Sequence, residues 1–249
     1  MALNNENIIK NISYDQSEIL HNIGTLYNGG SDIFDCDITA SKLGFYNGKG
    51  KYKIPEPKIL MDVCPLRDDI IKLDKWGAIP LPDNSITSLV IDLPFVITPS
   101  NAPSTKSKKD GSNLIYQRFN GYYPVDNLYK SYYHWLSESY RILKDDGILI
   151  FKTQSCISGG IRHNVEEFTF MAAQKIGFRM EDKFTLLAKA RLISNPKYKN
   201  GQKHSRSYTS SFLVFIKPKK KRKKDFDFQK LLDLCEKEEE SGYQLVIEK

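Results

Sequence analysis

The chain has 249 residues, of which 40% are hydrophobic and 27% charged, a composition typical of a globular protein and not of a disordered one. No apolar run approaches the ~20 residues that a membrane span needs, and the N-terminal residues lack the basic and apolar regions of a signal peptide. The four cysteines are too few and too scattered for a disulfide framework, and no spacing of His, Cys and carboxylate residues indicates a metal site. We therefore expect an intracellular protein without a metal or a membrane contact, cytoplasmic in a prokaryotic or phage-infected cell and nuclear if the source is eukaryotic.

The first 30 residues are predicted to form an N-terminal segment with one helix. Residues 1–14 are rich in asparagine and are expected to be loosely held. The helix is expected to start near Asp15, where Glu18 would complete a capping box, and to end at Asn28-Gly29-Gly30. Its predicted apolar stripe consists of Ile19, Ile23, Leu26 and Tyr27.

Short apolar runs then alternate with helical patterns. The runs are typical of strands in a parallel sheet, which are buried on both faces, and they cover 32–36, 58–63, 70–73, 86–92 and 147–152. Helices are predicted over 124–143 and 164–176, the second with an apolar stripe that includes Met171, and Lys144 to Gly147 is predicted to be a turn. The glycines and prolines of 37–57 leave too little room for a crossover helix, so that connection should be irregular.

Two long strands follow, at 178–192 and 207–217, with no helix between them, and we expect them to pair as an antiparallel hairpin. The sequence thus predicts an open, mostly parallel α/β sheet that ends in this hairpin. Three parts are expected: the N-terminal segment (1–30), the sheet domain (31–217) and a tail (218–249).

The net charge of +7 is unevenly distributed along the chain. Residues 217–224 hold seven basic groups and no acidic one, whereas 225–249 are acidic and contain a short apolar stripe predicted to be helical. The basic run has the form of a nuclear import signal and is equally suited to nonspecific DNA binding. The body of the chain is mildly basic by itself, which suits a polyanionic partner.

One group of residues combines the properties needed to hold a nucleobase. Asp92-Leu93-Pro94-Phe95 stands at the carboxyl end of the predicted strand 86–92, and ligands of open α/β sheets bind at that edge. A carboxylate can accept hydrogen bonds from an amino-bearing ring, the proline fixes the backbone, and the aromatic ring can stack on the base. A simpler interpretation is a strand-ending aspartate followed by a turn proline and a core phenylalanine.

In its wider context this group resembles the catalytic Asp-Pro-Pro-Tyr-like motif of the amino-group DNA methyltransferases. These enzymes use S-adenosyl-L-methionine (SAM) to methylate an exocyclic amine of adenine or cytosine. Leu73-Asp74 and Ile79 to Ile86 are similar to the segment that precedes this motif in the family, and Leu143 to Lys152 is similar to its helix-turn-strand signature. Lys203 to Lys217 resembles the final hairpin, so the resemblance covers about 58–217.

The resemblance implies a Rossmann-like methyltransferase fold and methyl transfer to a DNA base, with adenine the expected one, as in restriction–modification systems. Asp92 and the carbonyl of Leu93 would accept hydrogen bonds from the target amine, beside Pro94, and Phe95 would stack on the base. No covalent enzyme intermediate is needed. Two rivals stay open: an RNA methyltransferase on the same fold, and a catalytically inactive relative that only binds nucleic acid.

The cofactor site departs from the family pattern, because the usual glycine-rich SAM loop is absent. The nearest substitute is Phe34 to Phe45, which follows a predicted strand and is rich in small residues. The resemblance would assign Asp37 to the methionine amino group, Asp62 to the ribose hydroxyls and Asp74 to the adenine edge. Each of them could equally be a carboxylate of a surface loop.

Two predicted loops carry basic and aromatic residues without a matching number of acids. Both should project from the carboxyl edge of the sheet, beside Asp92, where they could contact phosphates around a flipped base. DNA is the expected partner and RNA a possible one; two solvated loops are the alternative, and no residue pattern indicates an oligomeric state. The cations are Lys106, Lys108, Lys109 and Arg118 in 98–121, and Lys197, Lys199, Lys203 and Arg206 in 193–207.

Overall fold

The computed structural model of the protein describes residues 8–46, 48, 50–97, 125–158, 160–189, 204–205 and 207–219. The chain divides into two compact units, Met1–Pro218 and Lys219–Lys249, and all helices and strands of the described residues lie in the first unit.

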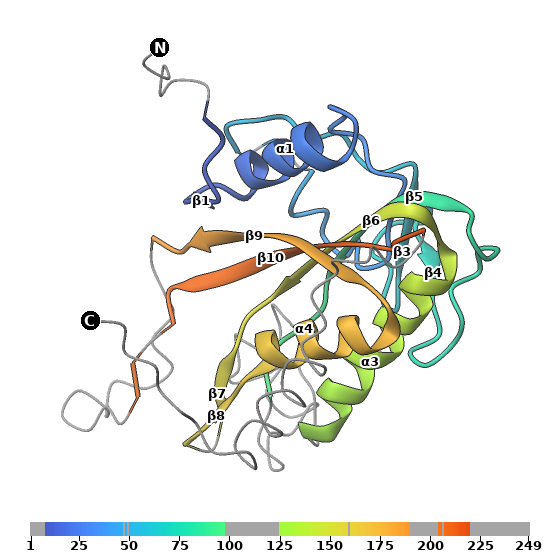
Figure 1. The fold of residues 1–249 in the computed structure, drawn as a ribbon. Helices are drawn as coiled ribbons and strands as arrows, with labels where there is room; N and C mark the ends of the chain where they lie inside the picture. Colours follow the sequence, from blue (N-terminus) through green and yellow to red (C-terminus); the bar gives the residue numbers. More distant parts are fainter. Residues whose placement is uncertain are drawn as a thin grey trace, which may run out of the picture. The chain divides into compact units, whose positions relative to one another are not determined.

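An eight-stranded sheet forms the centre of this unit (Figure 1). Its strands are β1 (Ile12–Ser13), β2 (Cys36–Asp37), β3 (Ile59–Asp62), β4 (Ile71–Lys72), β5 (Ile86–Asp92), β6 (Leu143–Thr153), β9 (Arg179–Leu187) and β10 (Thr209–Ile216). They lie in the order β1-β9-β10-β6-β5-β2-β3-β4. Among the described strands of this eight-stranded sheet, β10 alone runs antiparallel to its neighbours.

The strand order identifies a Rossmann-like α/β fold. From the β4 edge, β4-β3-β2 are followed by β5 and β6, so the chain reverses its direction of progress across the sheet between β2 and β5. Ligands of open α/β sheets bind at such a switch point, outside the carboxyl ends of the strands. The predicted open sheet and its final antiparallel hairpin are confirmed, because β9 pairs with β10 and β10 with β6.

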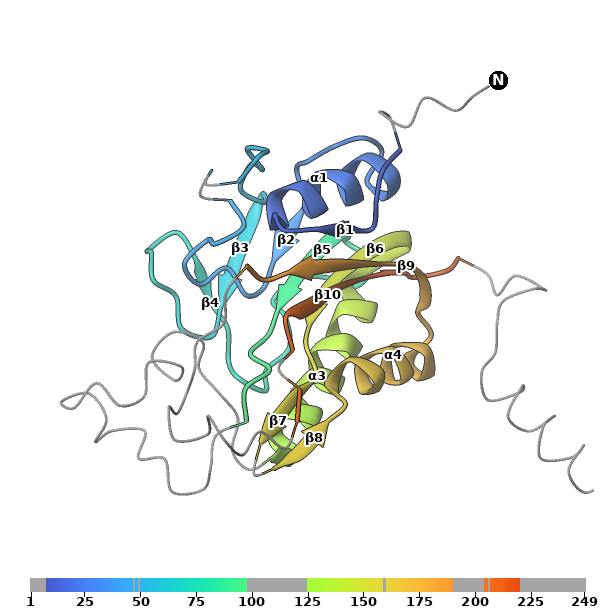
Figure 2. The same ribbon diagram turned by 90° about the vertical axis from the view of Figure 1, so that its left-hand side faces the viewer.

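Helices cover both faces of the sheet (Figure 2). Helix α1 (Gln16–Tyr27) packs on one face, over a core that includes Val90, Ile150 and Phe212. Helices α3 (Val125–Ile142) and α4 (Val165–Ile176) pack on the other face, over Leu89, Phe151 and other buried residues. The helices predicted at 124–143 and 164–176 are therefore confirmed.

Capping residues explain where helix α1 begins and where helix α4 ends. Asp15 is the N-cap of α1, and its side chain accepts a hydrogen bond from the amide of Ser17 at 2.8 Å. The reciprocal half of the predicted capping box is not formed, because the Glu18 carboxylate contacts Ser13 and Lys51 instead. In the other half of the chain, Gly177 closes α4 with a φ of 125°, a conformation that favours glycine.

Several sequence predictions are wrong in detail. Residues 11–13 are not loose, because β1 pairs with β9 at the sheet edge. The strand expected at 32–36 forms only at Cys36–Asp37, and β4 is exposed rather than buried because it is the opposite edge strand. A small hairpin of β7 (Cys156–Ser158) and β8 (Ile161–His163) has no counterpart among the predictions.

Other differences concern which residues face the core. Leu26 and Met171 lie exposed although both belong to the predicted stripes, and Leu20 is buried in α1 instead. Strand β6 begins at Leu143, so the predicted turn is part of it, with Asp146 at a φ of 60° where the pairing with β5 shifts register. Leu143 pairs with Ile86 and Ile148 with Ser88, so the residues of the predicted turn form a bulge between these two pairs.

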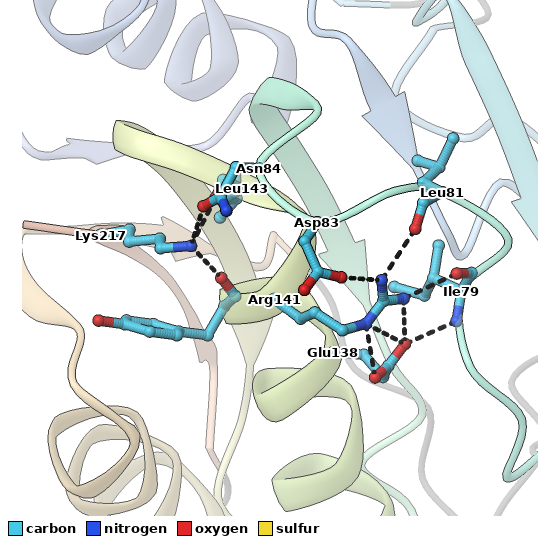
Figure 3. Close-up of polar contacts among 9 residues, drawn as sticks. Ile79, Leu81, Asp83, Asn84, Glu138, Arg141, Leu143 and Lys217 are labelled. Atoms are coloured by element: carbon cyan, nitrogen blue, oxygen red, sulfur yellow. Dashed lines mark hydrogen bonds and ion pairs between the residues drawn. The ribbon is translucent and has the colours of Figure 1, made fainter.

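At the amino edge of the sheet, where the parallel strands begin, Arg141 of α3 bonds the segment that leads into β5 (Figure 3). Its guanidinium donates to the carbonyls of Ile79 and Leu81 and to the carboxylates of Asp83 and Glu138, at 2.7–2.9 Å. Glu138 in turn accepts the amide of Ile79 at 2.7 Å. The hydrogen bond from Arg141 holds the pKa of Glu138 below its ordinary value.

Lys217, which follows β10, adds a second set of contacts (Figure 3). We call Arg141, Glu138, Asp83, Asn84 and Lys217 the amino-edge cluster. The ammonium of Lys217 donates to the side chain of Asn84 and to the carbonyls of Tyr140 and Leu143, at 2.6–2.7 Å, and the residue is buried. Lys217 is therefore not part of a solvated basic run, as its sequence context indicated, but a structural tie. Burial lowers its pKa.

We expect Arg141→Met to lower the free energy of unfolding by about 2–3 kcal/mol, because charged hydrogen bonds are removed and the Glu138 carboxylate keeps fewer partners. Urea unfolding followed by circular dichroism measures the effect. Arg67→Met is the matched control, since Arg67 also pairs with two carboxylates, Glu56 and Asp69, but on the surface, and its replacement should change stability little. Equal effects in the two variants would contradict a special role for the amino-edge cluster.

Candidate functional site

Three of the aspartates singled out by the sequence lie at the carboxyl ends of adjacent strands. Asp62 is the last residue of β3, Asp37 the last of β2 and Asp92 the last of β5, and these strands are consecutive in the sheet. The switch point between β2 and β5 therefore has a carboxylate on each side. Acids at this edge of the sheet can contact a ligand bound outside the strand ends.

Asp37 is buried and fully engaged by the loop that follows β2. One carboxylate oxygen accepts from the amide and the hydroxyl of Thr39, at 2.7 and 2.9 Å, and the other accepts from the hydroxyl of Tyr46 at 2.9 Å. The Thr39 hydroxyl also accepts the backbone N–H of Asp92 at 2.7 Å. A short hydrogen-bonded path thus joins the ends of β2 and β5.

Burial also changes the electrostatics of Asp37. Desolvation raises its pKa to about 7, hydrogen bonds from Thr39 and Tyr46 oppose this, and the charge of Asp92 adds to it. Burial likewise raises the pKa of Tyr46 well above its ordinary value, and the neighbouring Asp37 acts in the same direction. Asp37 is accordingly a carboxyl group whose ionised form would be favoured by a cation brought to it.

The loop after β2 also holds Asp62. Its carboxylate accepts the amide of Ser41 at 2.8 Å and that of Cys64 at 2.6 Å. Ser41 and Leu43 have φ angles of 40° and 54°, in the left-handed region that costs non-glycine residues conformational energy. The chain thus adopts, without glycine at these two positions, backbone conformations for which glycine is the usual residue.

Asp74 lies apart from this network. It follows the edge strand β4 by two residues, its side chain is exposed, and its carbonyl accepts the amide of Gly77 at 3.0 Å. Within the described residues no hydrogen bond joins it to Asp37, Asp62 or Asp92. The structure therefore brings together three of the four predicted aspartates.

Asp92 forms an ion pair with a residue that the sequence did not single out. Lys152, on the neighbouring strand β6, donates to Asp92 Oδ2 at 2.9 Å, and the two side chains are 14% and 29% exposed. Among the described residues nothing donates to the other oxygen, Oδ1.

The rest of the Asp92-Leu93-Pro94-Phe95 segment divides between the core and the edge. Leu93 is buried in the core on the α3 and α4 face, whereas Pro94 and Phe95 are half-buried. The hydroxyl of Tyr132 in α3 donates to the Pro94 carbonyl at 3.3 Å, which fastens the segment to the helix. Phe95 is thus only partly covered by the described residues.

Sequence reasoning missed Thr39, Tyr46 and Lys152. Lys152 had a signal, because a charged residue closes the apolar run 147–152 directly at the carboxyl edge. Thr39 and Tyr46 had none, since a threonine and a tyrosine in an irregular loop are ordinary. Their role depends on which strand lies beside β2.

The predicted basic residues Lys106, Lys108, Lys109, Arg118, Lys197, Lys199, Lys203 and Arg206 lie outside the described residues. The ends of their segments are described: the chain leaves β5 through Ile97 and returns at the start of α3, and it leaves β9 at Leu187 and returns at Thr209. Because β9 is parallel to β6, the second segment leaves and returns at the carboxyl edge.

Two kinds of feature are absent from the described residues. No group of three or more His, Cys, Asp and Glu side chains is arranged to hold a metal ion. No helix in the same residues is both long enough and apolar enough to cross a membrane.

No family model matches the chain, and no curated protein matches it either. Solved structures do resemble it. A protein of Thermus thermophilus assigned as a DNA modification methylase is 16% identical with a TM-score of 0.35, over 66% of this chain and 55% of that one. A further structure of that protein is complexed with SAM.

Two other solved structures extend the comparison. The PvuII DNA methyltransferase, cytosine-N4-specific, is 15% identical with a TM-score of 0.39, over 61% of this chain and 49% of that one. A protein of Sulfolobus solfataricus assigned as a type 11 methyltransferase is 18% identical with a TM-score of 0.40, over 86% of this chain and all of that one. The chain spans about half the length of the two DNA methylases, and its fold is assigned from its own strand order and directions.

The raised pKa of Asp37 predicts a pH dependence of stability. This pKa is 3.8 in an unfolded chain and about 7 in the folded one, so the folded protein holds the proton more tightly. The stability due to this proton is complete below about pH 4 and is lost as the pH rises through about 7. In Asp37→Asn this dependence is absent, because the amide does not titrate.

Urea unfolding of both proteins at pH 4.5, 6 and 7.5 measures the effect. The stability of Asp37→Asn relative to the original chain should increase by about 3 kcal/mol between pH 4.5 and 7.5, since one pKa unit corresponds to about 1.4 kcal/mol and part of the shift lies outside this range. Groups that do not interact with Asp37 titrate alike in the two proteins and cancel in the difference. A difference that stays constant from pH 4.5 to 7.5 would show that Asp37 is not a buried titrating group.

Proposed function

We propose that the chain is a SAM-dependent methyltransferase that acts on an exocyclic amine of a DNA base, with adenine the expected base. The observation that carries this proposal is the placement of Asp37, Asp62 and Asp92 at the carboxyl ends of β2, β3 and β5, around the switch point of a Rossmann-like sheet. The Asp92-Leu93-Pro94-Phe95 segment at the same edge resembles the catalytic motif of amino-group methyltransferases.

Asp92 is the residue that would orient the target amine. Its Oδ2 is held by Lys152, and its backbone is held by Thr39, so Oδ1 would accept an amine N–H from a fixed position. The carbonyl of Leu93 would accept the second N–H, and the half-buried ring of Phe95 would stack on the base. These contacts keep the amine lone pair free to react.

The carboxylates at the site are side chains that can bind the ammonium and ribose groups of SAM. Asp37 would hold the ammonium group, whose charge would favour the ionised form of this buried carboxyl, and Asp62 would accept the ribose hydroxyls. The small residues Thr39, Ala40 and Ser41 line the turn between them. When bound, SAM supplies an electrophilic methyl group.

Nucleic acid would approach at the carboxyl edge. The segments 98–121 and 193–207 leave and re-enter the described chain at that edge, and their eight cations would contact phosphates beside a flipped base. The basic run after Lys217 follows a residue tied to the amino edge, so we assign it only a nonspecific contribution to binding.

A second candidate function is favoured by one observation. All four carboxylate oxygens of Asp37 and Asp62 already accept hydrogen bonds from within the chain. If these bonds close the cofactor site permanently, the chain is a nucleic-acid-binding relative without transferase activity. Calorimetric titration with SAM decides between the two functions, because only the transferase requires saturable binding.

We expect Asp92→Ala to abolish methyl transfer while SAM affinity changes by no more than a few-fold, because Asp92 orients the amine and its strand is retained. Transfer of a radiolabelled methyl group from SAM to DNA measures the first effect, and calorimetry measures the second. Asp35→Ala is the matched control, since Asp35 also pairs with a lysine, Lys58, but at the opposite end of β2. A variant with more than a tenth of normal turnover would remove Asp92 from the mechanism.

The two groups of cations should behave differently. Replacing Lys197, Lys199, Lys203 and Arg206 by serine should depress turnover at saturating DNA, because the base is no longer positioned. Deleting 219–224, which leaves the buried Lys217 in place, should weaken binding to all DNA sequences alike and spare turnover. The salt slope of binding should fall by about one unit for every phosphate that the protein ceases to neutralise. Turnover that is unchanged in the serine variant would argue against a place for the second loop beside the active site.

A further inference from the structure

A polar pair stands at the end of a row of four residues that are paired in register across the sheet. Asp92 of β5 is paired in register with Lys152 of β6, Lys152 with Phe212 of β10, and Phe212 with Phe184 of β9. Phe184 and Phe212 are fully buried in the core under α1. The row therefore leads from the hydrophobic core to the candidate catalytic carboxylate, and Lys152 stands at the boundary.

The ammonium of Lys152 lies near two aromatic rings, those of Phe45 and Phe212, which we call its aromatic seat. The ammonium lies 5.0 Å from the centroid of Phe45 and 5.6 Å from that of Phe212, and the centroids of these two rings are 5.8 Å apart. A cation over aromatic faces is attracted by their negative charge density, so the rings hold the ammonium without competing for its hydrogen bonds. Phe45 belongs to the loop after β2, so this seat also touches the loop that engages Asp37 and Asp62.

This seat fixes how Asp92 presents its carboxylate. The ammonium donates to Oδ2 at 2.9 Å, and within the described part of the chain Oδ1 receives no donor. A charged group at the end of a long side chain normally loses entropy when it is held in one place, and the burial of the Lys152 side chain, which is 14% exposed, already restricts it. The carboxylate is consequently held in one orientation before any ligand arrives.

We propose that Lys152 is a positioning residue for methyl transfer, which directs Oδ1 of Asp92 toward the acceptor group by holding Oδ2. The role rests on the proposed function, since it acts through Asp92. Lys152 itself is not assigned a contact with the substrate. Its aromatic seat adds a second requirement: the loop after β2 must be in place for the ammonium to be held over Phe45.

The test uses the full chain with Lys152→Met, Lys152→Arg and Lys58→Met. Methionine keeps the apolar stem against the two rings and removes the charge, whereas arginine keeps a donor for the carboxylate. Lys58→Met is the matched control, because Lys58 also pairs with an aspartate, Asp35, at the other end of the sheet. Methyl transfer to DNA gives kcat and the KM for SAM, calorimetry gives the SAM affinity, and urea unfolding verifies that each variant is folded.

We expect Lys152→Met to lower kcat by about 10- to 100-fold, the reduction typical of a misplaced catalytic group, with the KM and affinity for SAM nearly unchanged. Lys152→Arg should recover most of the activity, and Lys58→Met should match the original chain. In an Asp92→Asn background, Lys152→Met should cause little further reduction, because the two residues act as a unit.

Two results would overturn the role of Lys152. One is a kcat of Lys152→Met within twofold of an active original chain. The other is an equal reduction of kcat in the Asp92 and Asp92→Asn backgrounds, which would show that Lys152 does not act through Asp92. An original chain that transfers no methyl group to DNA or RNA would instead overturn the proposed function, and this role with it.

Discussion

The hydroxyl of Thr39 joins two strands whose neighbouring ends define the site. It donates to the carboxylate of Asp37 and accepts the backbone N–H of Asp92, so one side chain spans the point where the sheet reverses its order. A hydroxyl is suited to this place because it can donate and accept at once. The candidate cofactor residue and the candidate catalytic residue are thereby held at a fixed separation, and both depend on the loop after β2.

The two edges of the sheet differ in what they contribute to stability. At the amino edge, Arg141 and Lys217 have nearly all their donors satisfied by carbonyls and carboxylates, an arrangement that stabilises the approach to β5. At the carboxyl edge, Asp37 is buried with a raised pKa, and Ser41 and Leu43 occupy left-handed conformations. Both features cost stability, and such costs concentrate where a protein binds or reacts. The amino edge offsets part of the conformational and electrostatic cost of the carboxyl edge.

Hydrophobic periodicity predicted the elements that have regular apolar spacing. Helices α3 and α4 and strand β5 follow from regular apolar spacing, and Asp92 could be placed at a strand end because the run before it is continuous. Short elements escaped, because β1 is a strand only through its pairing with β9, and two residues carry no periodic signal. Lys152 and Thr39 escaped for a related reason: their roles depend on the lateral order of strands, which local pattern does not encode. The sequence identified Asp37 as a candidate, but it did not predict that Asp37 is buried and bonded to Tyr46.

The register that places Asp92 beside Lys152 also bears on how the chain acquires its site. Residues 37, 92 and 152 come from distant parts of the sequence, and the aromatic seat of Lys152 needs Phe212 from the last strand. Contacts of such large sequence separation close slowly, because the entropy of long loops is lost before the contacts form. During synthesis on a ribosome the seat of Lys152 cannot be complete until β10 has emerged and inserted between β6 and β9. A chain arrested before that step would have both aspartates of the switch point, yet would lack the finished geometry around them.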